Sequence, residues 1–222
     1  MKVVALVPVK LNNERVPGKN LKTFSDGKTL MEFSLGNLDS VEGIDEIYVF
    51  SSSEEVVNYF PKNNRKIRFL QRPASLNTSE TKSQDILNAF IDKVDADIYV
   101  LFHVTSPFIT KESIETCVEK VVNGNYDSAH CVKKIEDFLW ENGKPLNFNP
   151  ASIVRTQDLS EIVKEITGVY VFKKEVFEKY QKRVGVNPYR HYIDSIQEID
   201  IDYPADFTLA YAMYDYYLKE KL

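Results

Sequence analysis

Cysteine and histidine are scarce in this sequence, which limits the chemistry open to it. Its 222 residues include two cysteines, Cys117 and Cys131, and three histidines that lie far apart. The cysteines lack C-x-x-C spacing and lie in apolar stretches, where a structural thiol is the usual role. We therefore expect neither a disulfide scaffold nor a zinc site, and a histidine-rich metal site is not indicated either.

The sequence also lacks a basic excess and long apolar runs. Asp and Glu number 33 against 28 Lys and Arg, whereas proteins that bind mainly nucleic acid are usually basic, so no nucleic-acid partner is expected. No stretch approaches the roughly 20 apolar residues that span a bilayer. The apolar run in the opening MKVVALVPVK is too short for a secretory signal. We expect a cytoplasmic protein without a membrane partner.

Short apolar runs alternate with helical patterns along most of the sequence. Residues 3–9 (VVALVPV) are nearly all apolar, as expected for a strand buried on both faces of a parallel sheet. Met31, Leu35 and Leu38 then recur at helical spacing. Further strands are expected at residues 46–50, 67–70, 97–102, 127–132, 168–172 and 196–201. Further helices are expected from Ser53, around 86–94 and 114–121, at 173–180, and from Pro204 to about Leu218.

This β-α-β-α order predicts an α/β fold with a doubly wound, mostly parallel, Rossmann-like sheet. The pattern breaks between about residues 134 and 165, where Trp140, Gly143 and Pro145 interrupt any clean helix. We interpret the whole chain, 1–222, as one domain with an inserted arm in that range. Ligands of such sheets bind beyond the carboxyl ends of the strands, so the loops that follow the strands are the places to look for function.

The first such loop, residues 8–20 (PVKLNNERVPGKN), carries three cations, Lys10, Arg15 and Lys19. A cationic loop with many backbone donors directly after a first parallel strand suits a triphosphate. It is neither a Walker A loop nor a dinucleotide fingerprint, because Gly18 is its single glycine. A solvated turn whose lysines serve solubility is the alternative.

Two further loops place polar side chains beyond strand ends. Arg72 follows a short strand and can meet a phosphate or a base carbonyl, and Ser83 can cap the next helix or contact a nucleotide. His103, Thr105 and Ser106 follow the buried strand at 97–102, where a substrate would lie. Ordinary helix caps and a structural histidine are the alternatives.

Near the end of the sequence, QEIDIDYPAD contains Asp200 and Asp202. On an extended segment, residues two apart point to the same face, so these carboxylates would lie side by side. Two adjacent carboxylates repel unless a cation joins them, and Mg²⁺ favours carboxylates together with substrate phosphates. The segment therefore predicts a Mg²⁺ site, and the alternative is one helix-capping Asp with a solvated neighbour.

In their order and spacing, these segments resemble the motifs of the acylneuraminate cytidylyltransferase family, which makes CMP-activated sialic acids and related acids. The opening P-A-R-x-x-S-K-x-x-P-x-K-N or its variants is matched by Pro8, Arg15, Pro17, Lys19 and Asn20. The R-P-x-x-L element is matched by Arg72, Pro73 and Leu76, with Ser83 and Asp85 downstream. The L-L-Q-P-T-S-P element is matched by Leu101, Thr105, Ser106 and Pro107. The R-x-Q-D-L and N-G elements are matched by Arg155, Gln157, Asp158, Leu159 and Gly168. The D-I-D-x-P-x-D element is matched by Asp200, Ile201, Asp202, Pro204 and Asp206.

The resemblance implies a nucleotidyltransferase-type fold, a homodimer in which the arm reaches the partner's site, and Mg²⁺ as cofactor. It implies that the anomeric hydroxyl of an acidic sugar attacks the α-phosphorus of CTP and that pyrophosphate leaves. The implied catalytic residues are Lys10, Arg15 and Lys19. The implied nucleotide-binding residues are Pro8, Val9, Lys10, Asn20, Arg72 and Ser83. The implied sugar-binding residues are His103, Thr105, Ser106, Arg155, Gln157 and Thr167, and the metal ligands are Asp200 and Asp202.

The sequence departs from the family pattern at positions that line the substrate. Lys10 replaces an Arg, Glu14 a Lys, Ser53 an Asp, His103 the sugar-facing Gln and Thr167 the Asn of N-G. We therefore expect the sugar, or the base, to differ from N-acetylneuraminate and CTP. The alternatives are a relative that uses GTP or another acidic sugar, a D-x-D glycosyltransferase, and a binding module that has lost catalysis.

Overall fold

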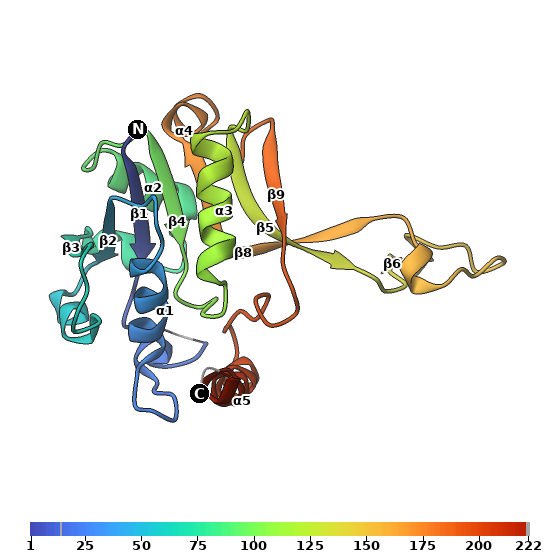
Figure 1. Ribbon diagram of the computed structural model, residues 1–222, viewed down its shortest axis with the longest axis horizontal. Coiled ribbons are helices and arrows are strands. Elements are labelled where there is room, and N and C mark those ends of the chain that lie inside the picture. The colour runs from blue at the N-terminus through green and yellow to red at the C-terminus, as the bar shows by residue number, and fades with distance from the viewer. Residues whose placement is uncertain (14, 221–222) are drawn as a thin grey trace.

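The computed structural model describes residues 1–13 and 15–220, with side chains as far as residue 216 apart from that of residue 14. In this part of the chain, seven strands form one sheet (Figure 1). In sheet order they are β3 (Ile67–Gln71), β2 (Glu46–Ser51), β1 (Val3–Pro8), β4 (Ile98–Phe102), β8 (Ile162–Lys173), β5 (Ser128–Ile135) and β9 (Pro188–Tyr192).

The strands run in one direction except β8. β1 pairs in parallel with β2 and β4, and β5 pairs in parallel with β9. β8 is antiparallel to both of its neighbours, β4 and β5. The prediction of a mostly parallel, Rossmann-like sheet is confirmed.

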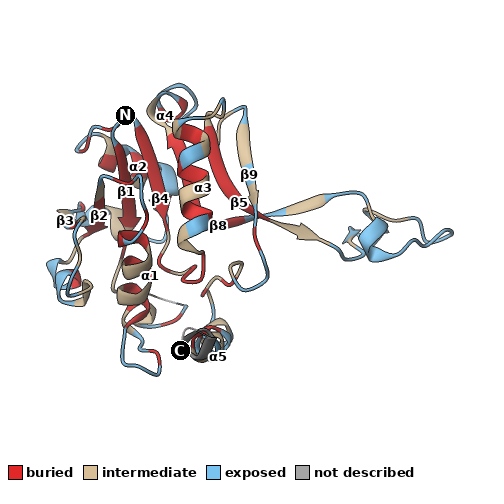
Figure 2. Ribbon diagram, in the orientation of Figure 1, coloured by how far each residue is buried: buried red, intermediate tan, exposed pale blue. Residues whose placement is uncertain are grey.

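Helices cover both faces of the sheet, which explains why β1 is apolar throughout. Val3, Ala5 and Val7 pack in one core cluster with residues of α1 (Leu30–Asp39) and α3 (Lys111–Val122). Val4 and Leu6 pack in another cluster with residues of α2 (Ser83–Ile91) and α4 (Lys174–Tyr180). In Figure 2 the central strands are accordingly almost wholly buried.

Two threonines fix the starts of the helices on the first face. The hydroxyl of Thr29 accepts from the backbone N–H of Glu32 at 3.1 Å, and that of Thr110 accepts from Ser113 at 3.2 Å. Such caps satisfy backbone donors that a helix start leaves free. The last helix, α5 (Pro204–Glu220), begins at the proline predicted to open it and packs on Phe24, Leu30 and Phe108. The short 3-10 turns are η1 (Lys19–Leu21), η2 (Glu54–Tyr59), η3 (Ala74–Asn77) and η4 (Thr156–Asp158).

The strand predicted at residues 196–201 was wrong. Ile199 and Ile201 are buried, so the sequence alternates like a strand, but the N–H of Ile199 donates to Ile196 in a tight turn. The strand that the sequence did not reveal is β9, whose sequence PYRHY has no apolar alternation. It is an edge strand that starts with a proline, a position where the missing N–H costs little.

The segment between Ile135 and Ile162 projects from the sheet as an arm (Figure 1). These two residues face each other in the β5–β8 ladder, so the two strands continue outward as the base of the arm. Farther out lies a small hairpin of β6 (Trp140–Glu141) and β7 (Lys144–Pro145). No helix in the described residues has the length and hydrophobicity of a membrane span.

Candidate active site

The predicted phosphate loop folds back on itself at the carboxyl end of β1. The Asn20 side chain, 4% exposed, donates to the backbone oxygen of Lys10 at 2.9 Å and so joins the two ends of the loop. Gly18 turns the chain there with a φ of 63°, a conformation that glycine adopts without steric cost. Lys19 Nζ then donates to the backbone oxygen of Ile201 at 2.5 Å, which ties the loop to a segment far along the chain.

The D-I-D segment is held against two of the other predicted loops. The N–H of Ile201 donates to the Thr105 oxygen at 2.9 Å. Asp202 Oδ1 lies 2.9 Å from Arg15 Nη2 and 3.5 Å from Lys19 Nζ. The fold therefore brings together the segments around residues 15, 105 and 201, as their predicted common role requires.

A cavity of about 220 Å³ adjoins this junction through Lys19 and Thr105, whereas Arg15, Asp200 and Asp202 do not line it. Seven of the predicted catalytic and substrate-binding residues line it, together with Asn13, Val104 and Ile86 of α2. The lining residues are Pro8, Lys10, Asn13, Lys19, Asn20, Arg72, Ile86, His103, Val104 and Thr105. Lys10, Lys19 and Arg72 give the cavity a positive lining, which suits a phosphate-bearing ligand.

Arg72 is the most unusual group in the cavity. It is 2% exposed, and its Nη2 donates to Asn77 Oδ1 at 2.7 Å, while its Nε has no partner. No carboxylate among the described residues forms an ion pair with it, and burial lowers the pKa of its guanidinium. A buried charge without a counter-charge is costly to the folded state, so an anionic ligand is the natural partner for Arg72.

Unpartnered buried polar atoms gather at the same place. Of six such side-chain atoms in the described residues, three belong to residues that line the cavity: Asn13 Oδ1, Asn20 Oδ1 and Arg72 Nε. Buried polar groups in proteins are nearly always hydrogen-bonded, so a cluster of exceptions indicates that a ligand supplies the missing hydrogen-bond partners.

Asp200 fits the predicted metal site, although not on a strand as expected. Its Oδ2 accepts from Thr167 Oγ1 at 3.0 Å, while its Oδ1 is buried without a partner. A carboxylate oxygen of that kind fits a cation. No group of three or more His, Cys, Asp or Glu side chains in the described residues could hold a metal ion, so phosphate oxygens would have to supply further ligands.

The backbone of His103 is held at the end of β4, where its N–H donates to the backbone oxygen of Gly168 at 2.9 Å. Loss of water around the ring lowers its pKa to about 4, with a further contribution from the positive charge of Arg183. The imidazole is therefore neutral at physiological pH, and it can donate and accept one hydrogen bond each.

Three predicted nucleotide or sugar residues turn away from the cavity. The N–H of Val9 donates to the oxygen of Phe50 at 3.1 Å and so extends the sheet. Ser106 is fully buried beneath Gly168, where a Cβ at position 168 would lie 2.6 Å from the Ser106 Cβ. Ser83 lines a different cavity.

Ser83 was also predicted as a possible helix cap, and this was wrong. α2 begins at Ser83, so the capping position is Lys82. Asp85, in the first turn of α2, caps the helix instead: its carboxylate accepts from the backbone N–H of Lys82 at 2.8 Å.

Arg155 and Gln157 lie on the arm, exposed, and within one chain they are not part of the cavity. Arg155 forms a bidentate pair with Asp158, at 2.7 and 3.2 Å. Their predicted contact with the sugar would need a second chain and stays a prediction. Glu14, one of the departures from the family pattern, lies outside the described residues.

Asn13 and Arg183 belong to the surroundings of the site but were not predicted. Asn13 is one of three asparagines in the loop at residues 8–20, and no spacing singles it out. Arg183 follows α4 in the run QKRVG, which is typical of a solvated turn. Its location beside the site depends on the path of the chain after α4, which no local pattern reveals.

Comparison with known proteins decides the family. The family model described as cytidylyltransferase matches residues 4–222. The chain belongs to this family. An N-acylneuraminate cytidylyltransferase from Danio rerio is 24% identical over 217 residues, which cover 94% of this chain and 50% of the relative. A pseudaminic acid cytidylyltransferase from Campylobacter jejuni is 23% identical over 182 residues, 77% of this chain and 78% of the relative.

Solved structures support the fold of this cytidylyltransferase chain. A CMP:2-keto-3-deoxy-manno-octonic acid synthetase complexed with CTP superposes with a TM-score of 0.71 over all of both chains, at 18% identity. A 4-diphosphocytidyl-2C-methyl-D-erythritol synthase from Anaerococcus prevotii superposes with a TM-score of 0.69 over 96% of each chain, at 14% identity.

Proposed function

We propose that this chain transfers CMP from CTP to an acidic sugar and releases pyrophosphate. The observation that supports this best is Arg72, a buried guanidinium that pairs with no carboxylate of the described residues, in a cavity that Lys10 and Lys19 also line. The names of the relatives supply the substrate class. Relatives named for N-acylneuraminate, pseudaminic acid and 3-deoxy-manno-octulosonate act on different sugars that are all acids.

In the proposed reaction, the anomeric hydroxyl of the sugar attacks the α-phosphorus of CTP. A new P–O bond forms, the bond from the α-phosphorus to the bridging oxygen breaks, and its electron pair leaves with pyrophosphate. The hydroxyl proton is released. Negative charge therefore grows on the departing pyrophosphate, and fixed cations stabilise it most when they are already in place. Lys10, Lys19 and Arg72 are the cations that line the cavity.

Mg²⁺ belongs to the proposal because Asp200 offers a buried, unpartnered carboxylate oxygen and Asp202 lies next to Arg15 and Lys19. These two aspartates would hold the ion. When bound, it would polarise the phosphate oxygens and neutralise part of their charge. Thr167 orients the Asp200 carboxylate through their hydrogen bond, which keeps the free oxygen in a fixed direction.

The sugar would lie beside the end of β4, where His103 and Thr105 line the cavity. A neutral His103 can hydrogen-bond a sugar hydroxyl without placing a second positive charge next to the nucleophile. Holding nucleophile and phosphorus in line accounts for much of the rate enhancement in such transfers.

A homodimer and a cytoplasmic location are further parts of the proposal. The arm exposes several large apolar side chains, among them Trp140 at 61% and Ile153 at 68%, and apolar surface that gathers on one segment is typical of a protein–protein contact. A second copy of the chain that covers the arm would also bring Arg155 to a neighbouring site.

The test is a panel that combines CTP, GTP, UTP and ATP with N-acetylneuraminate, pseudaminic acid and 3-deoxy-manno-octulosonate, scored by pyrophosphate release in Mg²⁺. We expect release with CTP and at least one acid, and none without an acid. If pyrophosphate were released with GTP and not with CTP, the nucleotide substrate would be GTP instead. Cleavage of a preformed CMP-sugar, without any pyrophosphate release in the panel, would favour a glycosyltransferase instead.

A further inference from the structure

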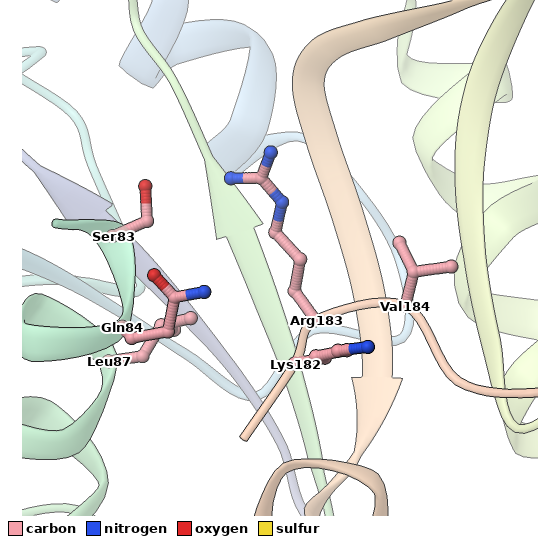
Figure 3. A pocket seen from close by; sticks show the side chains of 6 residues that line it. All are labelled: Ser83, Gln84, Leu87, Lys182, Arg183 and Val184. Carbon is pink, nitrogen blue, oxygen red and sulfur yellow. The ribbon is translucent and has the colours of Figure 1, made fainter. Parts of the chain in front are cut away.

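A second cavity, of about 330 Å³, lies between the first turns of α2 and the residues that follow α4 (Figure 3). It is lined by Ser83, Gln84, Leu87, Lys182, Arg183 and Val184. The active-site cavity also borders α2, because Ile86 lines it while the next residue, Leu87, lines the second cavity.

The central group of this cavity is Arg183. Its guanidinium lies 3.8 Å over the ring of Tyr170, and its Nη2 donates to the Tyr170 hydroxyl at 2.9 Å. Tyr170 in turn donates to Glu165 Oε1 at 2.5 Å. These contacts on β8 hold the planar guanidinium in one orientation, although its side chain is 25% exposed.

Arg183 points toward the site of the reaction. In Figure 3 its side chain runs between α2 and β8 toward the end of the neighbouring strand β4. His103 follows that strand end, and its backbone N–H donates to the oxygen of Gly168, two residues along β8 from Tyr170, whose ring Arg183 covers. The guanidinium therefore lies over the part of β8 that adjoins His103, which lines the active-site cavity.

The charge of Arg183 is only weakly compensated. The one carboxylate near it among the described residues, Glu165, lies 3.8 Å from Nη2 and is 49% exposed. A guanidinium has five N–H donors, and the described contacts of Arg183 use one of them, toward Tyr170. The remaining N–H groups of the guanidinium can donate to both oxygens of a carboxylate in a bidentate pair.

We propose that Arg183 binds the carboxylate of the acidic sugar from within the same chain. This inference rests on the proposed function, because it assumes that an acidic sugar is the acceptor. The carboxylate and the attacking hydroxyl of such a sugar are attached to the same carbon, so its partner must lie close to the reacting centre. Arg183 satisfies that condition, whereas Arg155 of the same chain is on the projecting arm and paired with Asp158.

The rest of the cavity then contacts the body of the sugar. Leu87 and Val184 offer apolar surface, and Ser83 and Gln84 offer hydrogen-bonding groups from the start of α2. Specificity for one acid over another would be set mainly by these four side chains, while Arg183 supplies the requirement for an acid.

The test crosses a change in the protein with a change in the ligand. Arg183→Gln keeps a donor for Tyr170 but removes the charge, and the primary amide of the sugar removes the carboxylate. The ligands are the best acid of the panel above and its amide, and their dissociation constants are measured with Mg²⁺ and a CTP analogue whose α,β-bridging oxygen is a methylene. We expect the wild-type chain to prefer the acid by roughly 10- to 100-fold and Arg183→Gln to lose most of that preference.

Arg190→Gln is the matched control, because Arg190 is an exposed arginine on β9, at the edge of the same sheet. It should keep the full preference, and the affinity for the CTP analogue should stay the same in both variants. Equal weakening of acid and amide by Arg183→Gln would overturn the inference, since Arg183 would then contact another part of the sugar or act through packing. If no acid supports turnover by the wild-type chain, the proposed function itself fails, so the two failures are distinguishable.

Discussion

Asp202 lies 2.9 Å from Arg15, so an acid predicted to bind metal neutralises a cation predicted to bind phosphate. Lys19, at 3.5 Å from the same oxygen, is engaged in the same way. Both cations would have to exchange this carboxylate for the triphosphate when the nucleotide binds. A divalent cation that binds Asp202 would favour the exchange, because it gives the carboxylate a new partner. The pair would therefore couple metal binding to nucleotide binding.

Asp202→Asn should separate these two effects. Without metal, in EDTA, we expect CTP to bind roughly 3- to 10-fold more tightly, since the competing charge is gone and partly exposed ion pairs contribute up to about 1 kcal/mol. With Mg²⁺, turnover should fall by about two to three orders of magnitude, because metal stabilisation of the transition state amounts to several kcal/mol. Calorimetry and pyrophosphate release measure the two quantities. Retained Mg²⁺-dependent turnover would remove Asp202 from the metal site.

Arg72→Met should weaken nucleotide binding without weakening the fold. Arg72 is buried and pairs with no carboxylate in the part of the chain that the structure describes, so methionine removes an uncompensated charge from the interior. The free energy of unfolding, measured in urea, should stay the same or rise. The affinity for CTP should fall by about 100-fold, since removing one partner of a desolvated charge pair costs about 2–5 kcal/mol.

Arg68→Met is the control for this prediction. Arg68 lies on β3, the strand that Arg72 follows, but its side chain is 62% exposed and pairs with Glu46 at 3.4 Å. It should change neither the affinity for CTP nor stability by more than about 0.5 kcal/mol. A strongly destabilised Arg72→Met with normal CTP affinity would show that Arg72 is structural.

Gly168→Ala should destabilise the chain because the added methyl has no room. Its Cβ would lie 2.2 Å from Ile109 Cδ1 and 2.6 Å from Ser106 Cβ. Ile109 can move its side-chain end, but the Ser106 Cβ is fixed to a buried backbone, so we expect a loss of about 1–3 kcal/mol. Gly36→Ala is the control: its nearest neighbour is Pro61 Cγ at 3.8 Å, and alanine there should stabilise α1 by about 0.5–1 kcal/mol. Urea unfolding compares the two variants, and equal stability would contradict the packing at Gly168.

The sheet and most of its helices could be predicted because their patterns are local. Buried strands such as β1 are apolar throughout, and the starts of α1 and α3 carry capping threonines. β9 could not be predicted, since an edge strand with polar residues leaves no periodicity to detect. The false strand at residues 196–201 shows the converse, because a turn that buries Ile199 and Ile201 imitates strand alternation.

The candidate site was predictable in its residue types but less so in their orientation. Lys10, Lys19, Arg72, His103 and Thr105 all line the cavity, as expected of loops beyond parallel strand ends. The direction of a side chain within a turn depends on packing elsewhere, which is why Ser106 lies under Gly168. The position of Arg183 depends on the path of the chain after α4, which the local sequence pattern does not indicate.

His103 should make the chain less stable as the pH falls below neutral. Its pKa is lowered from 6.5 to about 4 in the folded state, so between these values the unfolded chain binds a proton that the folded chain does not. Stability is therefore fully present above the unfolded pKa and is lost as the pH falls toward the folded pKa. From pH 7.5 to pH 5.0 the loss from this one group should be up to about 2 kcal/mol.

His103→Gln isolates this contribution, because glutamine does not titrate while other carboxylates and histidines remain. The free energy of unfolding is measured in urea with EDTA at both pH values, for wild type and variant. We expect the wild-type chain to lose more stability than the variant, by up to about 2 kcal/mol, since only its unfolded state gains the His103 proton. Equal losses would mean that His103 titrates near 6.5 in the folded chain. The imidazole would then be partly charged near neutral pH, and its assignment as an uncharged hydrogen-bonding group beside the nucleophile would have to be abandoned.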